Sequence, residues 1–250
     1  MFIGAIALFF WLLKLFLNGI IAVIPPEVEQ KLGAIIVPVY ERQAEPSPQQ
    51  DTLTKLLDRL ENNLPEKQNS QRNYQVLYIP ESTINALALP GDKIVIYQGL
   101  IEKVRSENEL MMVLGHELGH FAHRDHLRGL GNTLIIRASL AFFLGDLGIF
   151  QIPVGNTVEA IANARYSQSQ EKQADAFGLT LLNKTYGHVA GATDFFTRLS
   201  QEENGTISFL SSHPTSTERI QKLKSLIKEN NYPSKDRSPL PPTLTNLSEY

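Results

Sequence analysis

Residues 1–24 form the most continuous apolar segment of the chain. Only four of these 24 positions lie outside the hydrophobic set, namely Gly4, Lys14, Asn18 and Gly19. At about 1.5 Å per residue, a helix of this length can cross the roughly 30 Å hydrocarbon core of a bilayer. Lys14 opposes insertion by about 2.5 to 3.5 kcal/mol, which the surrounding Leu, Ile and Phe side chains offset. We therefore expect an N-terminal apolar helix that anchors the protein in a membrane as a single-pass segment.

The residues that flank this segment bear on its alternatives and its orientation. No Lys or Arg precedes it and no A-x-A-like site follows it, so a cleaved signal peptide fits less well than an anchor. A buried or interfacial amphipathic helix is the other alternative. Lys31 and Arg42 follow the segment within about 20 residues, and they give a weak indication that the rest of the chain is cytoplasmic.

Between residues 25 and 104 the pattern predicts short elements. Ala34–Tyr40 is partly β-branched and contains Pro38, which suits an edge strand. Ser47 and Pro48 are typical of an N-cap and a first helical position, and leucines then recur at helical spacing, at Leu53, Leu56, Leu57, Leu60 and Leu64. Strands are predicted at 74–79, 84–89 and 93–97, and the last two flank a turn sequence that predicts a hairpin.

From residue 106 onward helices dominate the prediction. Ser106 to Glu109 is a capping-box sequence, which predicts a helix running to about Arg124. Further helices are predicted at 127–147, 157–184, 190–200 and 215–231. Polar residues interrupt the apolar stretch 134–152, which favours a packed helix over a second span. From Pro233 onward the chain has four prolines in 18 residues, which predicts a disordered tail over 233–250.

Composition limits the kind of protein that these elements can build. The chain has 250 residues, 42% of them hydrophobic and 20% charged, which suffices for a buried core without disulfides. Its formal net charge of −3 argues against a nucleic-acid partner. Six histidines and no cysteine exclude thiol nucleophiles and cysteine-ligated metals. Any metal must therefore be bound by nitrogen and oxygen.

A candidate metal site lies in the helix predicted after Ser106. His116 and His120 are the ends of an H-E-x-x-H sequence, and positions i and i+4 share one helix face, so both imidazoles can reach one metal ion. Glu117 between them would act as a general base toward a metal-activated water. Two histidines on a plain surface helix are the alternative. Apolar neighbours and two mid-helix glycines, which cost about 1 kcal/mol each, argue against it.

Two histidines leave one ligand to find, and the residues offer two candidates. His126 has the spacing of a third metzincin histidine, but His123 occupies the turn-glycine position and no methionine follows the motif. Glu171 shares a helix face with Asp175, so Glu171 could complete the site while Asp175 orients a ligand imidazole. From the residues alone, such an acidic pair is also common on a solvated helix face.

Four segments in order give the chain a resemblance to the HtpX-like and CAAX-prenyl-protease-like zinc metallopeptidases, which are membrane-integrated or membrane-associated gluzincins. The resemblance covers roughly residues 87–226. It rests on the hairpin segment Leu89-Pro90-Gly91-Asp92 to Leu100, on Gly115 to His120, on Glu171 to Asp175, and on Ser212-His213-Pro214 followed by Arg219.

The resemblance implies a fold and a set of residue roles. The fold would be α+β and mostly helical, with a small sheet and hairpin beside the H-E-x-x-H helix. One Zn²⁺ per chain would be bound by His116, His120 and Glu171, with Glu117 as the base and Asp175 behind the ligands. His213 would stabilise the oxyanion, and Arg219 would contact substrate or transition state. The family often has Ser-Arg where this chain has Ser167-Gln168, so a basic group near the third ligand is missing.

We therefore predict a membrane-associated zinc metalloendopeptidase acting on protein or peptide substrates, with protein quality control as the expected role. Its parts would be the apolar helix 1–24, the peptidase domain 25–232 and the tail 233–250. Strand 93–97 would be an edge strand, either plain or pairing with an extended substrate. A catalytically silent chaperone or scaffold is the alternative function, and the intact motif argues against it.

Overall fold

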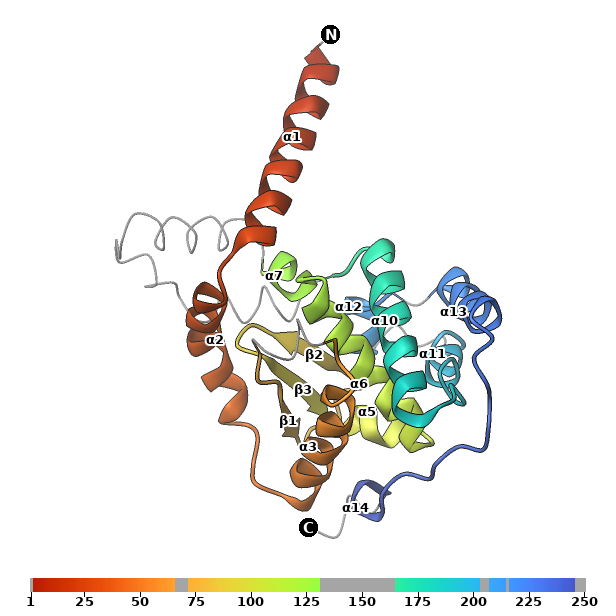
Figure 1. Ribbon diagram of the computed structural model, residues 1–250. Coiled ribbons are helices and arrows are strands. Elements are labelled where there is room, and N and C mark those ends of the chain that lie inside the picture. Colours follow the sequence, from red (N-terminus) through yellow and green to blue (C-terminus); the bar gives the residue numbers. More distant parts are fainter. Residues whose placement is uncertain (1, 66–71, 131–164, 203–206, 215, 246–250) are drawn as a thin grey trace.

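The computed structural model describes residues 2–65, 72–130, 165–202, 207–214 and 216–245, with only part of the side chains between residues 2 and 17. Its strands are β1 (Gln75–Ile79), β2 (Ala86–Leu89) and β3 (Lys93–Tyr97). Its helices, labelled in Figure 1, are α1 (Phe2–Val23), α2 (Pro26–Glu41), α3 (Pro48–Glu61), α5 (Gln98–Lys103), α6 (Glu107–Ala122), α7 (Asp125–Gly129), α10 (Gln168–Tyr186), α11 (Asp194–Leu199), α12 (Ser208–Ser212), α13 (Thr217–Glu229) and α14 (Pro242–Thr245).

Most of the predicted elements are confirmed. The three strands, the hairpin, and the helices that became α3, α6, α11 and α13 lie where the sequence predicts them, to within a few residues at each end. Ser47 and Ser106 cap α3 and α6 by accepting a hydrogen bond from a backbone N–H of the first turn. The helix predicted at 157–184 begins only at residue 168, as α10, because residues 165–167 are not helical and the Ser167 side chain caps the helix there. The packed helix predicted at 134–152 lies outside the described residues.

The sheet has the order β1-β3-β2. β1 runs parallel to β3, and β2 runs antiparallel to it as the other half of the hairpin. The turn that joins β2 to β3 contains Gly91 and Asp92, whose backbones lie in the left-handed region with φ of 84° and 61°. The prediction of Lys93–Tyr97 as an edge strand is wrong, because β1 and β2 occupy both of its sides. This strand therefore has no free side for an extended substrate.

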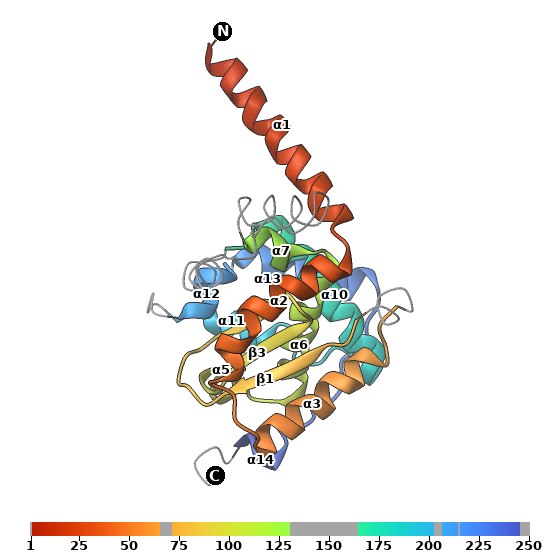
Figure 2. The same cartoon turned by 90° about the vertical axis from the view of Figure 1, so that its left-hand side faces the viewer.

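Both faces of the sheet are buried, and successive residues of β3 face opposite cores. Ile94 and Ile96 pack into the core formed with α3, α6 and α10. Val95 packs into a second core with α2. Figure 2 shows α2 crossing the sheet on the side that faces the viewer. Because neither face is open to water, the strands are apolar at almost every position.

The prediction of a strand at Ala34–Tyr40 is wrong, because these residues belong to helix α2. Four large side chains of α2 recur every four residues and are at most 3% exposed, namely Val28, Leu32, Ile36 and Tyr40. Glu29, Gly33 and Val37, each next to one of these four, are buried as well, and a strand would put such neighbours on opposite faces, whereas a helix keeps them on the side that packs on the sheet. Pro38 lies inside α2, in its C-terminal half, and the helix continues past it to Glu41. Burial of one apolar face therefore overrides the local preference of the β-branched residues.

α6 and α10 cross at small residues. A Cβ added to Gly115 would lie only 3.1 Å from the Gly178 Cα, and Gly119 faces Ala174 in the same way. Glycine in a helix interior costs about 1 kcal/mol relative to alanine, so these positions need a packing reason. The reason is that the two backbones approach closely, which brings the side chains of α6 and α10 within contact distance of one another.

The predicted disordered tail is ordered through residue 245. Leu244 in α14 is 1% exposed and joins the core formed with α3 and α6. The backbone of Ser238 forms two hydrogen bonds with the start of α6. Its N–H donates to Asn108 Oδ1, and its carbonyl oxygen accepts from the Glu107 backbone N–H. Backbone hydrogen bonds and one buried leucine therefore hold a segment whose composition is typical of disorder.

A cluster of buried charges ties α2 to the hairpin and to α7. Arg72 donates to both carboxylate oxygens of Glu29, at 2.6 and 2.9 Å, and to Asp92 at 2.6 Å. His126 Nε2 lies 2.7 Å from the same Glu29 carboxylate. Burial alone would raise the pKa of Glu29, but His126 and Arg72 together hold it far below its ordinary value of 4.5. Glu29 is therefore a buried anion held by two partners, the buried His126 and the partly exposed Arg72.

α1 leaves the rest of the molecule and extends away from it (Figures 1 and 2). The sequence predicts a single-pass span here. Within the part of the chain that the structure describes, no helix has the length and apolarity that crossing a membrane requires.

Candidate metal centre

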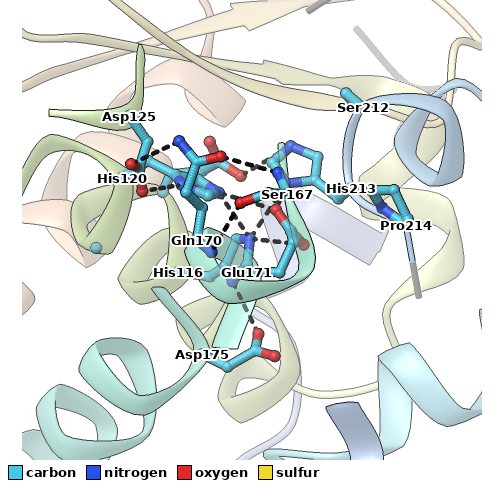
Figure 3. Close-up of polar contacts among 12 residues, drawn as sticks. His116, His120, Asp125, Ser167, Gln170, Glu171, Asp175, Ser212, His213 and Pro214 are labelled. Carbon is cyan, nitrogen blue, oxygen red and sulfur yellow. Dashed lines mark hydrogen bonds and ion pairs between the residues drawn. The ribbon is translucent and has the colours of Figure 1, made fainter. Parts of the chain in front are cut away.

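Three elements bring the candidate ligands together (Figure 3). α6 presents His116 and His120 one turn apart, α10 presents Glu171, and His213 directly follows α12. The Ser167 side chain caps α10 and so fixes where that helix begins. Glu171 consequently lies in the first turn of α10, beside the two histidines of α6.

The side-chain atoms of this group lie close enough to share one ion. His116 Nε2 is 3.1 Å from His120 Nε2, and His120 Nε2 is 3.4 Å from Glu171 Oε1. Glu171 Oε2 is 3.8 Å from His116 Nε2. His213 Nδ1 is 3.2 Å from both His116 Nε2 and Glu171 Oε1. All four residues are fully buried.

A carboxylate holds the other nitrogen of each α6 histidine. His116 Nδ1 is 2.9 Å from Asp175 Oδ1, and His120 Nδ1 is 3.2 Å from Asp125 Oδ2. The sequence singled out Asp175 but missed Asp125, which is the first residue of α7. The only sequence signal for it was an acidic residue shortly after the H-E-x-x-H motif.

These contacts set the charge states around the group. Burial lowers the pKa of His116. Burial would also lower that of His120, but hydrogen bonds to Asp125 and Glu171 and the nearby carboxylate charges raise it to about 9. For Glu171, burial is outweighed by the histidines around it, which hold its pKa far below the ordinary value. Glu171 is therefore ionised at any physiological pH.

Arg219 lies behind the ligands. Its Nε and Nη2 donate to the two oxygens of Asp175, at 2.8 and 2.7 Å, and Nη1 pairs with Glu171. Nη1 also donates to the Pro214 carbonyl at 3.1 Å, next to His213. The residue is 2% exposed. The sequence proposes Arg219 as a contact for substrate or transition state, and the structure places its guanidinium on these two carboxylates.

Glu117 differs from its neighbours in having few partners. Both carboxylate oxygens are buried and form no hydrogen bond within the described residues. His213 Nε2 lies 3.6 Å from Glu117 Oε1. The Tyr166 ring stacks on His120, with centroids 3.8 Å apart, and its backbone N–H donates to the Ser212 carbonyl. Tyr166 and the segment before His213 therefore cover the site together.

The other three histidines contact different groups. His126 pairs with Glu29, His123 Nδ1 lies 2.8 Å from the Gly119 carbonyl, and His188 Nδ1 accepts from the Ala190 backbone N–H. None of them belongs to the group of possible metal ligands found in the described residues, which consists of His116, His120, Glu171 and His213.

The donor set fits a divalent transition-metal ion. One ligand atom from each of the four residues lies within 4.8 Å of the others. Because Asp175 and Asp125 lie at the two Nδ1 positions, the Nε2 atoms of His116 and His120 face each other, 3.1 Å apart. Once His120 has lost its proton, both Nε2 lone pairs can bind one cation. Imidazole nitrogen with carboxylate oxygen is a donor set that such ions prefer.

Comparison with known proteins identifies the family. The model of peptidase family M48 matches residues 49–227. Metalloprotease LoiP of Escherichia coli is 33% identical over 178 residues, which is 69% of this chain and 68% of LoiP. Metalloprotease YcaL of the same organism is 32% identical over 180 residues, covering 70% of this chain and 68% of YcaL.

A eukaryotic relative matches a smaller share of its own length. Mitochondrial metalloendopeptidase OMA1 of Arabidopsis thaliana is 28% identical over 156 residues, which cover 60% of this chain and 31% of OMA1. The matched part of the chain contains the whole buried histidine and carboxylate group described above. With this group on crossed helices and a family model that matches most of its length, the chain belongs to peptidase family M48 and is a metallopeptidase.

Proposed function

We propose that the protein is a zinc-dependent endopeptidase whose ion is bound by His116, His120 and Glu171. The observation that carries this proposal is the convergence of these three donors beside the carboxylate of Glu117, which has no hydrogen-bond partner in the described residues. A buried carboxylate without such a partner is costly, and it is expected where a proton must be taken up.

Zinc suits the spacing of the donors. Ligands bonded at about 2.0 to 2.2 Å to a tetrahedral ion lie about 3.3 to 3.6 Å apart. The three separations between His116, His120 and Glu171 are 3.1, 3.4 and 3.8 Å. Small shifts of the side chains are enough to complete this geometry. His213 would then serve the reaction and not the binding of the ion.

In the proposed reaction, water is added across a peptide bond. Zn²⁺, when bound, polarises the substrate carbonyl and makes the water more acidic. Glu117 takes a proton from the attacking water while the water oxygen forms a bond to the carbonyl carbon. The carbon–nitrogen bond then breaks, and Glu117 passes the proton to the leaving amine. His213, 3.6 Å from Glu117, would donate a hydrogen bond to the oxyanion that develops.

Asp175 and Arg219 would act through the ligands. Asp175 holds His116 with its Nε2 directed at the ion, and so strengthens the imidazole as a ligand. Arg219 would be a positioning residue, because its guanidinium holds Asp175 and Glu171 in place. This arrangement supplies a basic group near the third ligand from α13 in place of the arginine missing after Ser167.

Replacement of Glu117 by Gln tests the catalytic assignment. The Glu117→Gln variant should bind zinc as the wild type does and lose cleavage of casein, because the amide cannot take up a proton. The exposed Glu81→Gln variant is the matched control and should remain active. Casein cleavage by Glu117→Gln would refute the base. Full casein binding without cleavage by the wild type would instead favour the chaperone or scaffold alternative.

Metal analysis tests the ligands separately. His120→Ala and Glu171→Ala should each purify with less than one zinc per chain, whereas the control His188→Ala should keep it. Full zinc occupancy in Glu171→Ala would show that another residue, such as His213, completes the site.

We also propose that α1 attaches the enzyme to a membrane. Its described apolar side chains include several that are 49 to 63% exposed, namely Leu8, Trp11, Leu12, Leu15 and Phe16. Water does not favour so many large exposed side chains on one helix, whereas the lipid interface does. Attachment would bring the site close to misfolded or membrane proteins as substrates, on the cytoplasmic side if the flanking cations set the orientation.

Flotation with phosphatidylcholine vesicles tests the attachment. The wild type and the Thr54→Glu control should float with the vesicles. The double variant Trp11→Glu and Phe16→Glu should stay in solution, because two carboxylates oppose burial in lipid. Flotation of the double variant at the wild-type level would refute α1 as the attachment site.

A further inference from the structure

Asp125 connects the proposed ligand His120 to the rest of the molecule. Its Oδ2 lies 3.2 Å from His120 Nδ1, and Asp125 is 1% exposed. A carboxylate in this position fixes the tautomer and the ring plane of a ligand imidazole. Asp125 therefore supports His120 in the same way as Asp175 supports His116, although it comes from the start of α7 and not from α10.

The other oxygen of Asp125 is held from two sides. Arg128 Nη1 donates to Oδ1 at 2.7 Å, and Gln170 Nε2 donates to the same atom at 2.8 Å. Arg128 also donates through Nε to Asn18 Oδ1 in α1, at 3.3 Å. A continuous series of polar contacts thus joins α1 to His120 through Arg128 and Asp125.

Arg124, the residue before Asp125, provides a second connection to α1. Its backbone is left-handed, with φ of 58°, which is uncommon for a residue with a side chain and costs about 1 kcal/mol or more. Its Nη1 donates to the carbonyls of Ile21 and Ile24 at the C-terminal end of α1, at 2.8 and 2.7 Å. A helix end leaves such carbonyls without helical partners, and a cation there is favourable.

The two connections have the same effect on the turn between α6 and α7. The left-handed residue directs the chain so that Asp125 faces His120. The hydrogen bonds of Arg124 to α1 offset the cost of that conformation, and Arg128 holds the carboxylate. The end of α1 is thereby part of the support of the metal site.

We propose that Asp125 is a positioning residue for His120 and that its position depends on the docking of the C-terminal end of α1 by Arg124 and Arg128. Detachment or displacement of α1 would then weaken metal binding without any change in the ligands. This inference rests on the proposed role of His120 as a ligand.

The first experiment measures zinc affinity of the full chain by competition with a chelator. Asp125→Asn should lower the zinc affinity by about 10- to 100-fold, because the amide lacks the charge and cannot accept from His120 at one end and from Arg128 and Gln170 at the other. The exposed Asp51→Asn variant is the matched control and should leave it unchanged. Cobalt substitution adds a readout of ligand geometry: the visible band should shift in Asp125→Asn and not in Asp51→Asn.

The second experiment tests the link to α1. The double variant Asn18→Ala and Arg124→Gly removes both attachments while glycine keeps the left-handed backbone. It should lower zinc affinity by about two- to tenfold, and it should have no further effect when Asp125 is already Asn. If Asp125→Asn does not fold, Arg128→Met replaces it as the test: it removes the partly exposed partner of Asp125 and should also lower zinc affinity.

The possible results separate this inference from the proposed function. Wild-type zinc affinity in His120→Ala would refute the ligand assignment itself. Loss of zinc in His120→Ala with wild-type affinity and an unchanged cobalt band in Asp125→Asn would overturn the role of Asp125. An effect of Asp125→Asn without any effect of the α1 double variant would overturn the dependence on α1.

Discussion

Replacement of Gly119 by alanine tests whether close contact between α6 and α10 builds the metal site. The added Cβ would lie 2.7 Å from the Ala174 Cα and 2.9 Å from the Ala174 carbonyl oxygen, where ordinary contact begins at 3.4 Å. Both are backbone atoms, so no side-chain rotation can relieve the overlap. α10 would have to move outward as a unit, and it carries Glu171 one turn before Ala174.

The expected magnitude combines two opposing effects. Alanine should favour the helix by about 1 kcal/mol relative to glycine. Overpacking a tight contact costs about 1 to 3 kcal/mol where side chains can adjust, and more where only backbone can move. We expect net destabilisation of about 1 to 3 kcal/mol, or about 2 to 4 °C in melting temperature for each kcal/mol. Displacement of Glu171 should also reduce zinc affinity about tenfold or more.

Gly19→Ala in α1 is the matched control, because nothing lies within 4 Å of its added Cβ. The same chemical change should there be neutral or slightly stabilising. Thermal unfolding followed by circular dichroism and zinc competition measure the two effects on both variants. A Gly119→Ala protein with wild-type melting temperature and zinc affinity would refute the close-contact reasoning.

Three further variants test other parts of the structure by chemical denaturation. Glu29→Gln should be less stable by about 1.5 to 3 kcal/mol at pH 7, because it removes the charge from the hydrogen bonds that Glu29 makes with Arg72 and His126. This loss of stability relative to the wild type should become smaller as the pH falls below about 5. Arg219→Met should cost about 3 to 5 kcal/mol by leaving the Asp175 carboxylate without its buried cation. Leu244→Ala should cost about 2 to 5 kcal/mol, because Leu244 is buried in the core, whereas the exposed Lys235→Ala should cost almost nothing.

The direction of the pH effect follows from the lowered pKa of Glu29. A carboxyl whose pKa is depressed on folding contributes stability at pH values above its unfolded pKa, ordinarily 4.5, and loses that contribution as the pH falls. A difference in unfolding free energy between Glu29→Gln and the wild type that stayed constant down to pH 3 would contradict this reasoning. For Arg219→Met and Leu244→Ala, losses below about 0.5 kcal/mol would contradict the proposed packing.

The sequence by itself determined the parts of the protein that depend on local periodicity. The H-E-x-x-H spacing places His116 and His120 on one helix face whatever the rest of the chain does. The capping residues and leucine spacing located α3 and α6, and Gly91 located the hairpin turn. The two glycines of α6 indicated that this helix had a special packing role.

Only the tertiary structure decided which distant residues meet. No local pattern marks Asp125, and the sequence marked Arg219 only through the family resemblance and with another role, because both act where helix ends converge behind the ligands. Ala34–Tyr40 became helical because one face had a sheet to cover, and the proline-rich tail became ordered because α3 and α6 offered it a surface. Burial and long-range hydrogen bonds are properties of the assembled chain, so no short stretch of sequence can specify them.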